Sequence, residues 1–216
     1  MFEFWSVNNI AFRLIGYPMS YIELLGTIFY LWSVWLISKR EILTWAVGIV
    51  SVLLYMALFY QIRLYSDALE QVYYLFVSVY GWWRWSTPQP DTGKVLDVRY
   101  CPHRKFLLTA VVTIVVAIAL GTVMSRVHLL LPTIFQQPAS YPYLDAITTV
   151  MSFTAMGLMA QKCIESWYYW IIVDIIGIGL YYAKEVKFIS LLYVILLFMA
   201  INGLISWRKA AKMRKA

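Results

Sequence analysis

The residues of this sequence that could recognise a ligand lie inside long apolar stretches. Asp174 lies seven residues into the stretch 167–183, at the end of WYYWIIVD, and Trp167 and Trp170 precede it at spacings that place all three on one helical face. A buried carboxylate costs about 2.5–3.5 kcal/mol on insertion scales, so it points to function. Two indoles beside it suit a flat cationic or polar ligand. There are two alternatives: Asp174 could pair with a hydroxyl or amide of a neighbouring helix for structural reasons, and Trp167 could lie at the membrane interface.

Two further apolar stretches carry polar groups that could complete this site. In residues 68–86, Gln71 and Tyr74 share a helical face, and a glutamine amide can bind hydroxyls or a carboxamide. Its alternative is a helix–helix hydrogen bond, worth about 0.6 kcal/mol on average. Tyr193 and Asn202 are the corresponding candidates in the last stretch. Glycine follows Asn202, so a close helix contact is the stronger interpretation there.

No pattern in the sequence predicts catalysis or a metal site. His103 and His128 belong to no cluster of Cys or His, and no nucleophile is paired with a base inside an apolar stretch. No Walker sequence is present. Cys101 and Cys163 are too few for a disulfide framework, and we expect reduced thiols. The sequence therefore predicts no enzyme, no metal and no cofactor.

The composition places these residues in a membrane protein. Of 216 residues, 62% are hydrophobic and 13% charged, whereas soluble domains contain about 45–50% and about 25%. The mean hydropathy is +0.69. The net charge of +7 is dispersed in short segments between apolar stretches and forms no continuous basic face, so nucleic-acid binding is not expected.

A membrane-spanning helix needs about 20 mainly apolar residues. Seven stretches qualify: 22–38, 43–62, 68–86, 106–131, 144–160, 167–183 and 188–207. We therefore predict an all-α polytopic protein with a single membrane domain, 1–216. Its parts are an N-terminal interfacial helix (1–20), a first repeat (21–85), a cytoplasmic loop (86–105), a linker helix (106–131), a second repeat (143–207) and a basic cytoplasmic tail (208–216).

The basic residues predict the orientation. If residue 22 enters from outside, 13 of them lie inside, against 5 outside, as the positive-inside rule requires. The inner set is Lys39, Arg40, Arg84, Lys94, Arg99, Arg104, Lys105, Lys162, Arg208, Lys209, Lys212, Arg214 and Lys215. The outer set is Arg13, Arg63, Arg126, Lys184 and Lys187. The C-terminus is therefore expected in the cytoplasm.

An internal repeat is visible when residues 21–85 are laid on 143–207 without gaps. The matched pairs are Tyr21 and Tyr143, Thr27 and Thr149, Trp45 and Trp167, Tyr60 and Tyr182, Gly81 and Gly203, and Trp85 and Trp207. Overall identity is low, and apolar helices resemble one another by composition, but an ungapped register of Trp and Gly is hard to obtain by chance. Three helices plus one linker predict two copies with the same orientation, an architecture known in transporters.

The sequence resembles the PnuC family of bacterial nicotinamide riboside transporters along nearly its whole length. The resemblance rests on FWSVNNI, IELLGTI (22–28), LFYQIRLYSDALEQVYY (58–74), YGWWRW (80–85), YPYLDAITTVMS (141–152), ESWYYWIIVD (165–174) and INGLISW (201–207). It implies a 3+1+3 fold related to the SWEET sugar transporters. The family's tryptophan motif falls on Trp167 and Trp170, and its glutamine on Gln71.

The same resemblance implies facilitated diffusion of nicotinamide riboside through the bacterial inner membrane, trapping by a cytosolic kinase, and a homotrimer. Some relatives carry asparagine where this chain has Asp174, which leaves a charge role open. Close relatives move thiamine or riboflavin. Two alternatives remain: a transporter of the same architecture for another sugar-bearing solute, and a membrane subunit that transports nothing.

Overall fold

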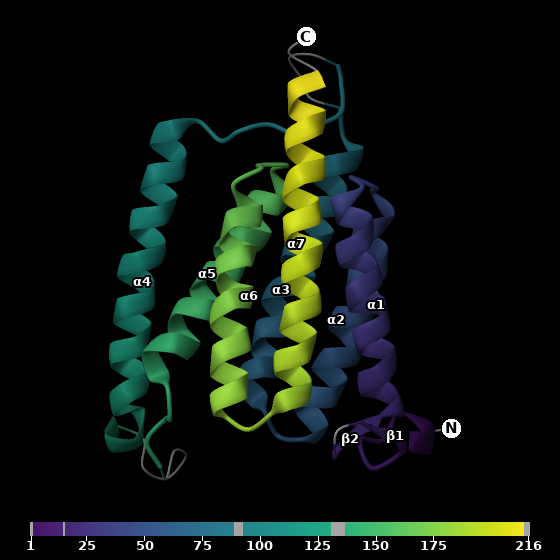
Figure 1. Ribbon diagram of the computed structural model, residues 1–216, viewed down its shortest axis with the longest axis vertical. Coiled ribbons are helices and arrows are strands. Elements are labelled where there is room, and N and C mark those ends of the chain that lie inside the picture. The colour runs from purple at the N-terminus through teal and green to yellow at the C-terminus, as the bar shows by residue number, and fades with distance from the viewer. Residues whose placement is uncertain (1, 15, 89–92, 131–136, 214–216) are drawn as a thin grey trace.

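A computed structural model describes residues 2–14, 16–88, 93–130 and 137–213. Within them lie seven α-helices: α1 (Tyr21–Ser38), α2 (Leu43–Gln61), α3 (Tyr65–Ser86), α4 (His103–Leu130), α5 (Pro142–Ala160), α6 (Ser166–Ala183) and α7 (Lys187–Met213). Each coincides with one predicted stretch, and α7 continues into the basic tail (Figure 1). Parts of the predicted polar loop, of the break after α4 and of the tail lie outside the described residues.

Five of the described helices, α1, α2, α4, α5 and α7, are long and apolar enough to cross a membrane. The other two, α3 and α6, run alongside them in the bundle (Figure 1). Both contain polar residues within the helix, among them Gln71 on α3 and Asp174 on α6. These two helices carry most of the predicted site.

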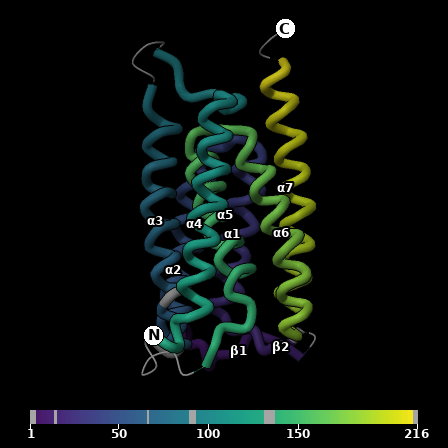
Figure 2. The backbone as a smooth tube through the Cα atoms, turned by 90° about the vertical axis from the view of Figure 1, so that its left-hand side faces the viewer, coloured from purple at the N-terminus to yellow at the C-terminus, as the bar shows by residue number. Residues whose placement is uncertain are grey.

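Six helices form a closed ring. Packing contacts join α1 to α2, α2 to α3, α3 to α5, α5 to α6, α6 to α7, and α7 back to α1. Helix α4 packs on α5 and stands at the edge of the molecule (Figure 1). The side view shows all the helices lying roughly along one axis, with the β-strands at one end and the C-terminal end of α7 at the other (Figure 2). The ring encloses the centre, and the linker helix lies outside it.

The N-terminal segment is not the predicted helix. It forms a short 3-10 turn (Phe2–Trp5) and an antiparallel hairpin of β1 (Ile10–Leu14) and β2 (Tyr17–Ser20). Gly16 has a φ of +79°, which suits a tight turn, and Pro18 lacks the N–H that a helix needs. These two residues favour a hairpin over a continuous helix.

Backbone geometry recurs at the spacing of the predicted repeat. In the described part of the chain, the non-glycine residues with positive φ are Arg40 (66°), Lys162 (52°), Arg63 (61°) and Glu185 (62°). They form two pairs, 40 with 162 and 63 with 185, each separated by 122 residues. Arg40 and Lys162 follow α1 and α5, and the other pair follows α2 and α6. Such backbone is uncommon in residues with side chains, so its recurrence supports the repeat.

The structure differs from the sequence prediction at the cysteines. Cys101 and Cys163 form a disulfide with a Cα–Cα distance of 5.5 Å. The segment before α4 pairs with the α5–α6 connection, where Arg99 N donates to Lys162 O at 3.0 Å and Ile164 N donates to Arg99 O at 3.0 Å. This pairing brings together two cysteines that are 62 residues apart.

Candidate functional site

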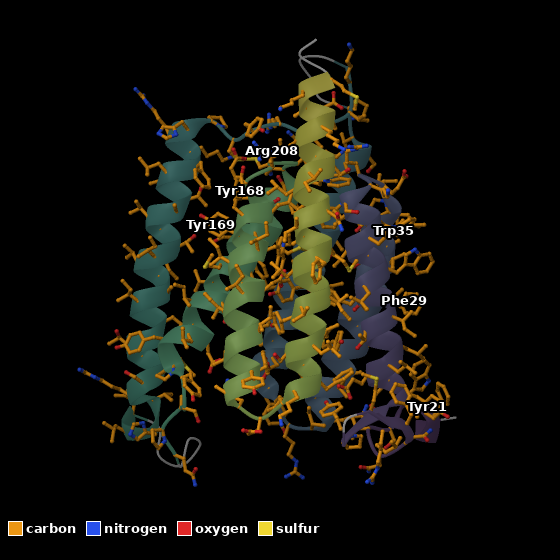
Figure 3. All side chains as sticks on the ribbon, viewed as in Figure 1. Tyr21, Phe29, Trp35, Tyr168, Tyr169 and Arg208 are labelled. Atoms are coloured by element: carbon orange, nitrogen blue, oxygen red, sulfur yellow. A yellow bond between two sulfur atoms is a disulfide. The ribbon has the colours of Figure 1, made fainter. Side chains whose placement is uncertain are left out.

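The six-helix ring encloses a cavity of about 970 Å³. All six ring helices and the N-terminal hairpin line it, and α4 contributes none of the lining residues. Helical side chains reach the cavity because each ring helix turns one face inward. The opposite face is exposed, as Trp35 on α1 shows, with 51% of its surface accessible (Figure 3). The cavity has the size of a small-molecule site, typically about 300–1,000 Å³.

The structure brings six of the seven predicted site residues to this cavity. They are Gln71, Tyr74, Trp167, Trp170, Asp174 and Tyr193. The seventh, Asn202, is exposed on α7 and does not line the cavity. It follows Ile201, which is also exposed, and precedes Gly203, which is buried against Trp167. Helical rotation thus turns the glycine inward and the asparagine outward.

Asp174 is the most deeply placed carboxylate of the cavity. Only 3% of its surface is exposed. Within the part of the chain that the structure describes, its side chain forms no hydrogen bond or ion pair. A buried carboxylate without a partner is costly. Pairing with a neighbouring helix, the alternative considered from the sequence, therefore does not explain the burial of Asp174. Its surroundings suit a ligand that donates hydrogen bonds or carries positive charge.

Aromatic rings form much of the wall beside Asp174. Trp170 is half-buried and packs against both hydrophobic clusters of the protein. Tyr193 stacks on Tyr181 with a centroid distance of 5.3 Å. Gly177 allows this arrangement, because a Cβ at that position would lie 2.5 Å from the Tyr193 ring. These contacts position flat surfaces that can stack on a planar ligand.

Three further acids, missed from the sequence, line the cavity. Glu23, Asp67 and Glu70 join Asp174, whereas Arg13 is the one basic residue among the described lining residues. Glu70 accepts a hydrogen bond from Thr149 at 3.1 Å. The sequence contains a signal for two of them, since Glu23 and Asp67 lie in the first turns of α1 and α3, but that position equally fits a favourable interaction with the helix dipole. The resulting cavity favours cations over anions.

The hairpin borders the cavity at the end where these acids lie. Tyr17 donates a hydrogen bond to Glu23 at 2.7 Å and stacks on Phe188 of α7 with centroids 5.2 Å apart. Gln61 of α2 donates to Trp5 O at 2.9 Å. Burial, followed by the hydrogen bond to Glu23, raises the pKa of Tyr17 above its ordinary value. The N-terminal segment thus contacts α2 through Trp5 and α7 through Tyr17, whose phenol stays neutral.

The opposite end of the cavity is filled by a tryptophan cluster, Trp45, Trp85, Trp167 and Trp207. Trp45 meets Trp85 edge-on with centroids 5.3 Å apart, and Trp167 meets Trp207 at 5.5 Å, both at 88°. Trp85 and Trp207 each donate to a backbone carbonyl. At most 3% of each residue is exposed, so the cluster forms a solid layer.

Donor atoms of Cys101, Cys163 and Glu165 lie within 4.8 Å of one another. The two sulfurs are joined to each other, and Glu165 Oε2 accepts a hydrogen bond from Cys101 N at 2.9 Å. These atoms are therefore engaged in structural contacts. The group lies outside the cavity lining and fastens the loop before α4 to the start of α6.

Comparison with known proteins gives consistent matches. Residues 20–209 match the nicotinamide mononucleotide transporter family. The nicotinamide riboside transporter PnuC of Escherichia coli (strain K12) is 33% identical, with 98% of this chain and 97% of that protein covered. The riboflavin/roseoflavin transporter RibM of Streptomyces davaonensis is 28% identical, with 93% and 91% covered. The crystal structure of the vitamin B3 transporter PnuC has a TM-score of 0.67 at 22% identity and covers 89% and 83% of the two chains, so the fold is shared.

Proposed function

Since this chain belongs to the nicotinamide mononucleotide transporter family, we propose that it carries nicotinamide riboside across the bacterial inner membrane by facilitated diffusion. The observation that carries the proposal is the cavity within the helix ring, where the buried Asp174 has no partner among the described residues and lies on the same helix face as Trp170. The relative from Escherichia coli bears the name of this substrate.

The chemistry of the substrate fits the lining. Nicotinamide riboside has a flat cationic ring, a carboxamide and ribose hydroxyls. Trp170 and Tyr193 offer stacking surfaces, Asp174 and Glu70 offset positive charge, and Gln71 can bind hydroxyls or the carboxamide. The acids also disfavour a phosphorylated anion. A nucleotide is therefore expected to bind more weakly than the riboside.

Two three-helix units of like orientation, 21–85 and 143–207, provide a means of transport. Their recurring turns and tryptophan contacts support this division. The cavity lies between them, closed at one end by the tryptophan cluster and bordered at the other by the hairpin. Rocking of one unit against the other would expose the cavity alternately to the two sides. Phosphorylation in the cytosol would then trap the riboside, so transport needs no energy coupling.

Orientation and assembly are part of the same proposal. The excess of basic residues on one side supports an orientation with the tryptophan-cluster end and the C-terminus in the cytoplasm. We infer a homotrimer from the resemblance to the PnuC family. Helix α4 exposes an apolar face, including Leu108, Val115 and Ile118, which fits either lipid or a neighbouring protomer. Chemical cross-linking in native membranes, resolved by mass, tests the trimer.

A second candidate substrate is riboflavin, because a full-length relative is a riboflavin/roseoflavin transporter. A thermal-shift panel on purified protein distinguishes the candidates: nicotinamide riboside, riboflavin, thiamine and nicotinamide mononucleotide. We expect the largest stabilisation with the riboside, together with saturable uptake into proteoliposomes in the absence of ATP or an ion gradient. A larger shift with riboflavin would reassign the substrate. No saturable uptake of any of the four would contradict the transporter function itself.

A further inference from the structure

The four indole N–H groups of the tryptophan cluster are not equivalent. Trp85 Nε1 donates to Ala160 O at 3.1 Å and Trp207 Nε1 donates to Ile37 O at 3.0 Å. Trp45 Nε1 and Trp167 Nε1 are buried and have no hydrogen-bond partner in the described structure. Only 1% of each of these two residues is exposed. A buried donor without a partner is rare and costs free energy.

The two unpartnered donors occupy corresponding positions. Trp45 lies near the start of α2, and Trp167, 122 residues later, lies near the start of α6. Both residues line the cavity. An unsatisfied donor that recurs in both units, on residues that border the cavity, indicates a shared purpose and not a single packing fault.

Each ring is packed closely against a glycine of a neighbouring helix. Gly81 lies under Trp45 and Gly203 under Trp167, each so close that a Cβ would come within 3.0 Å of the indole. On the cavity side, the side chains next to the two indoles are flexible. Met156 and Met159 line the cavity and pack in the same cluster, and thioether side chains adapt readily. A ligand atom can reach the covered N–H groups by displacing such a side chain.

We propose that Trp45, which the resemblance did not assign, is a substrate-positioning residue that acts with Trp167: their indole N–H groups donate to an oxygen acceptor at one end of the transported molecule. The inference rests on the proposed function. Trp167 and Asp174 are seven residues apart on α6, roughly 10 Å along the helix axis. The molecule recognised is therefore elongated, with its positive charge near Asp174 and a hydroxyl or carboxamide oxygen at the indoles.

Indole N–H resonances of full-length protein labelled with ¹⁵N-tryptophan in detergent micelles test this directly. On saturation with nicotinamide riboside, we expect the Trp45 and Trp167 signals to move downfield, while those of Trp85 and Trp207 stay in place. Trp45→Phe and Trp167→Phe assign the peaks. In calorimetric titrations Trp45→Phe should weaken binding roughly three- to tenfold, the range for one neutral hydrogen bond. Trp83→Phe on the exposed face of α3 is the control and should leave affinity unchanged, since Trp83 does not line the cavity. Trp85→Phe, which loosens the cluster but removes an N–H that already has a partner, should weaken binding less than Trp45→Phe.

The results of these experiments distinguish failure of the inference about Trp45 from failure of the proposed transport function. If the wild-type protein binds the riboside and the Trp45 signal does not move, the role of Trp45 is overturned while transport stands. Equal loss of affinity in Trp45→Phe and Trp85→Phe also overturns it, because general loosening of the cluster then accounts for the effect. If the wild-type protein shows no binding heat, the proposed substrate fails, and the inference fails with it.

Discussion

The indole nitrogen of Trp207, near the end of α7, donates a hydrogen bond of 3.0 Å to the backbone carbonyl of Ile37, at the end of α1. Trp85 of α3 makes the matching bond of 3.1 Å to Ala160 of α5. Each indole therefore ties the last helix of one unit to the first helix of the other. In the proposed rocking motion, separation of the two units at this end would break both bonds.

Loss of either bond should destabilise the protein. Trp85→Phe removes the donor to Ala160 O, and Trp207→Phe removes the donor to Ile37 O, which keeps its bond from Arg40 N at 3.0 Å. Loss of one neutral hydrogen bond costs about 0.5–1.5 kcal/mol. We expect a lower Tm for each variant in a thermal-shift assay. Trp35→Phe is the control, since Trp35 is 51% exposed. A Tm equal to that of the wild type in both cluster variants would show that the bonds do not hold this end closed.

Two glycines should tolerate alanine very differently. At Gly203 a Cβ would collide with the Trp167 ring, whereas at Gly179 nothing lies within 4 Å. Gly203→Ala is expected to cost about 1–3 kcal/mol through overpacking. Gly179→Ala should be neutral or stabilising by up to about 1 kcal/mol, the helix propensity difference. Unfolding in graded SDS compares them, and equal stability would mean that the Trp167 ring moves freely.

Trp170→Ala should weaken binding of nicotinamide riboside more than tenfold, because the variant removes the stacking surface beside Asp174. One such ring contact with a desolvated cation is worth about 2 kcal/mol. Calorimetric titration measures the change. Trp83→Ala serves as the control, since Trp83 is 58% exposed. Unchanged affinity in Trp170→Ala would remove this residue from the site.

Asp174→Asn should leave the protein folded but slow the uptake of the cationic riboside, because the amide keeps hydrogen bonding and loses the charge. Uptake into proteoliposomes and elution on gel filtration measure the two properties. Asp145→Asn is the matched control: Asp145 forms an ion pair with Lys184 at 2.9 Å but does not line the cavity. An Asp174→Asn protein that fails to fold would favour a structural role instead.

The cysteine pair reports the orientation. If the tryptophan-cluster end faces the cytoplasm, Cys101 and Cys163 should be reduced in cells and trapped by a membrane-permeant alkylating agent. After purification in air, their adjacency should yield the disulfide, detected by peptide mass without reductant. Cells that contain the disulfide despite rapid alkylation would indicate the opposite orientation.

Much of the architecture could be predicted from the sequence. Long apolar stretches have one stable form in a bilayer, the helix, because every backbone polar group must find a partner within the segment. Polar residues inside those stretches marked the cavity for the same reason, since Asp174 and Gln71 are too costly to face lipid. The hairpin was missed because a mixed, half-polar segment fits a helix or a strand by composition.

Other properties required the tertiary structure. Helical periodicity places residues on a face but does not say which face points inward: Asn202 was a site candidate with a helix contact as the stronger interpretation, and it lies on the exposed face of α7. Proximity across the chain is likewise invisible in one sequence: the cysteines meet through pairing of residues 99 and 163. The sequence alone determined that the chain is a helical membrane protein with polar groups in its spans. Only the closed ring decided which of those groups share a cavity and which indole N–H groups remain without partners, because both depend on how helices distant in sequence pack together.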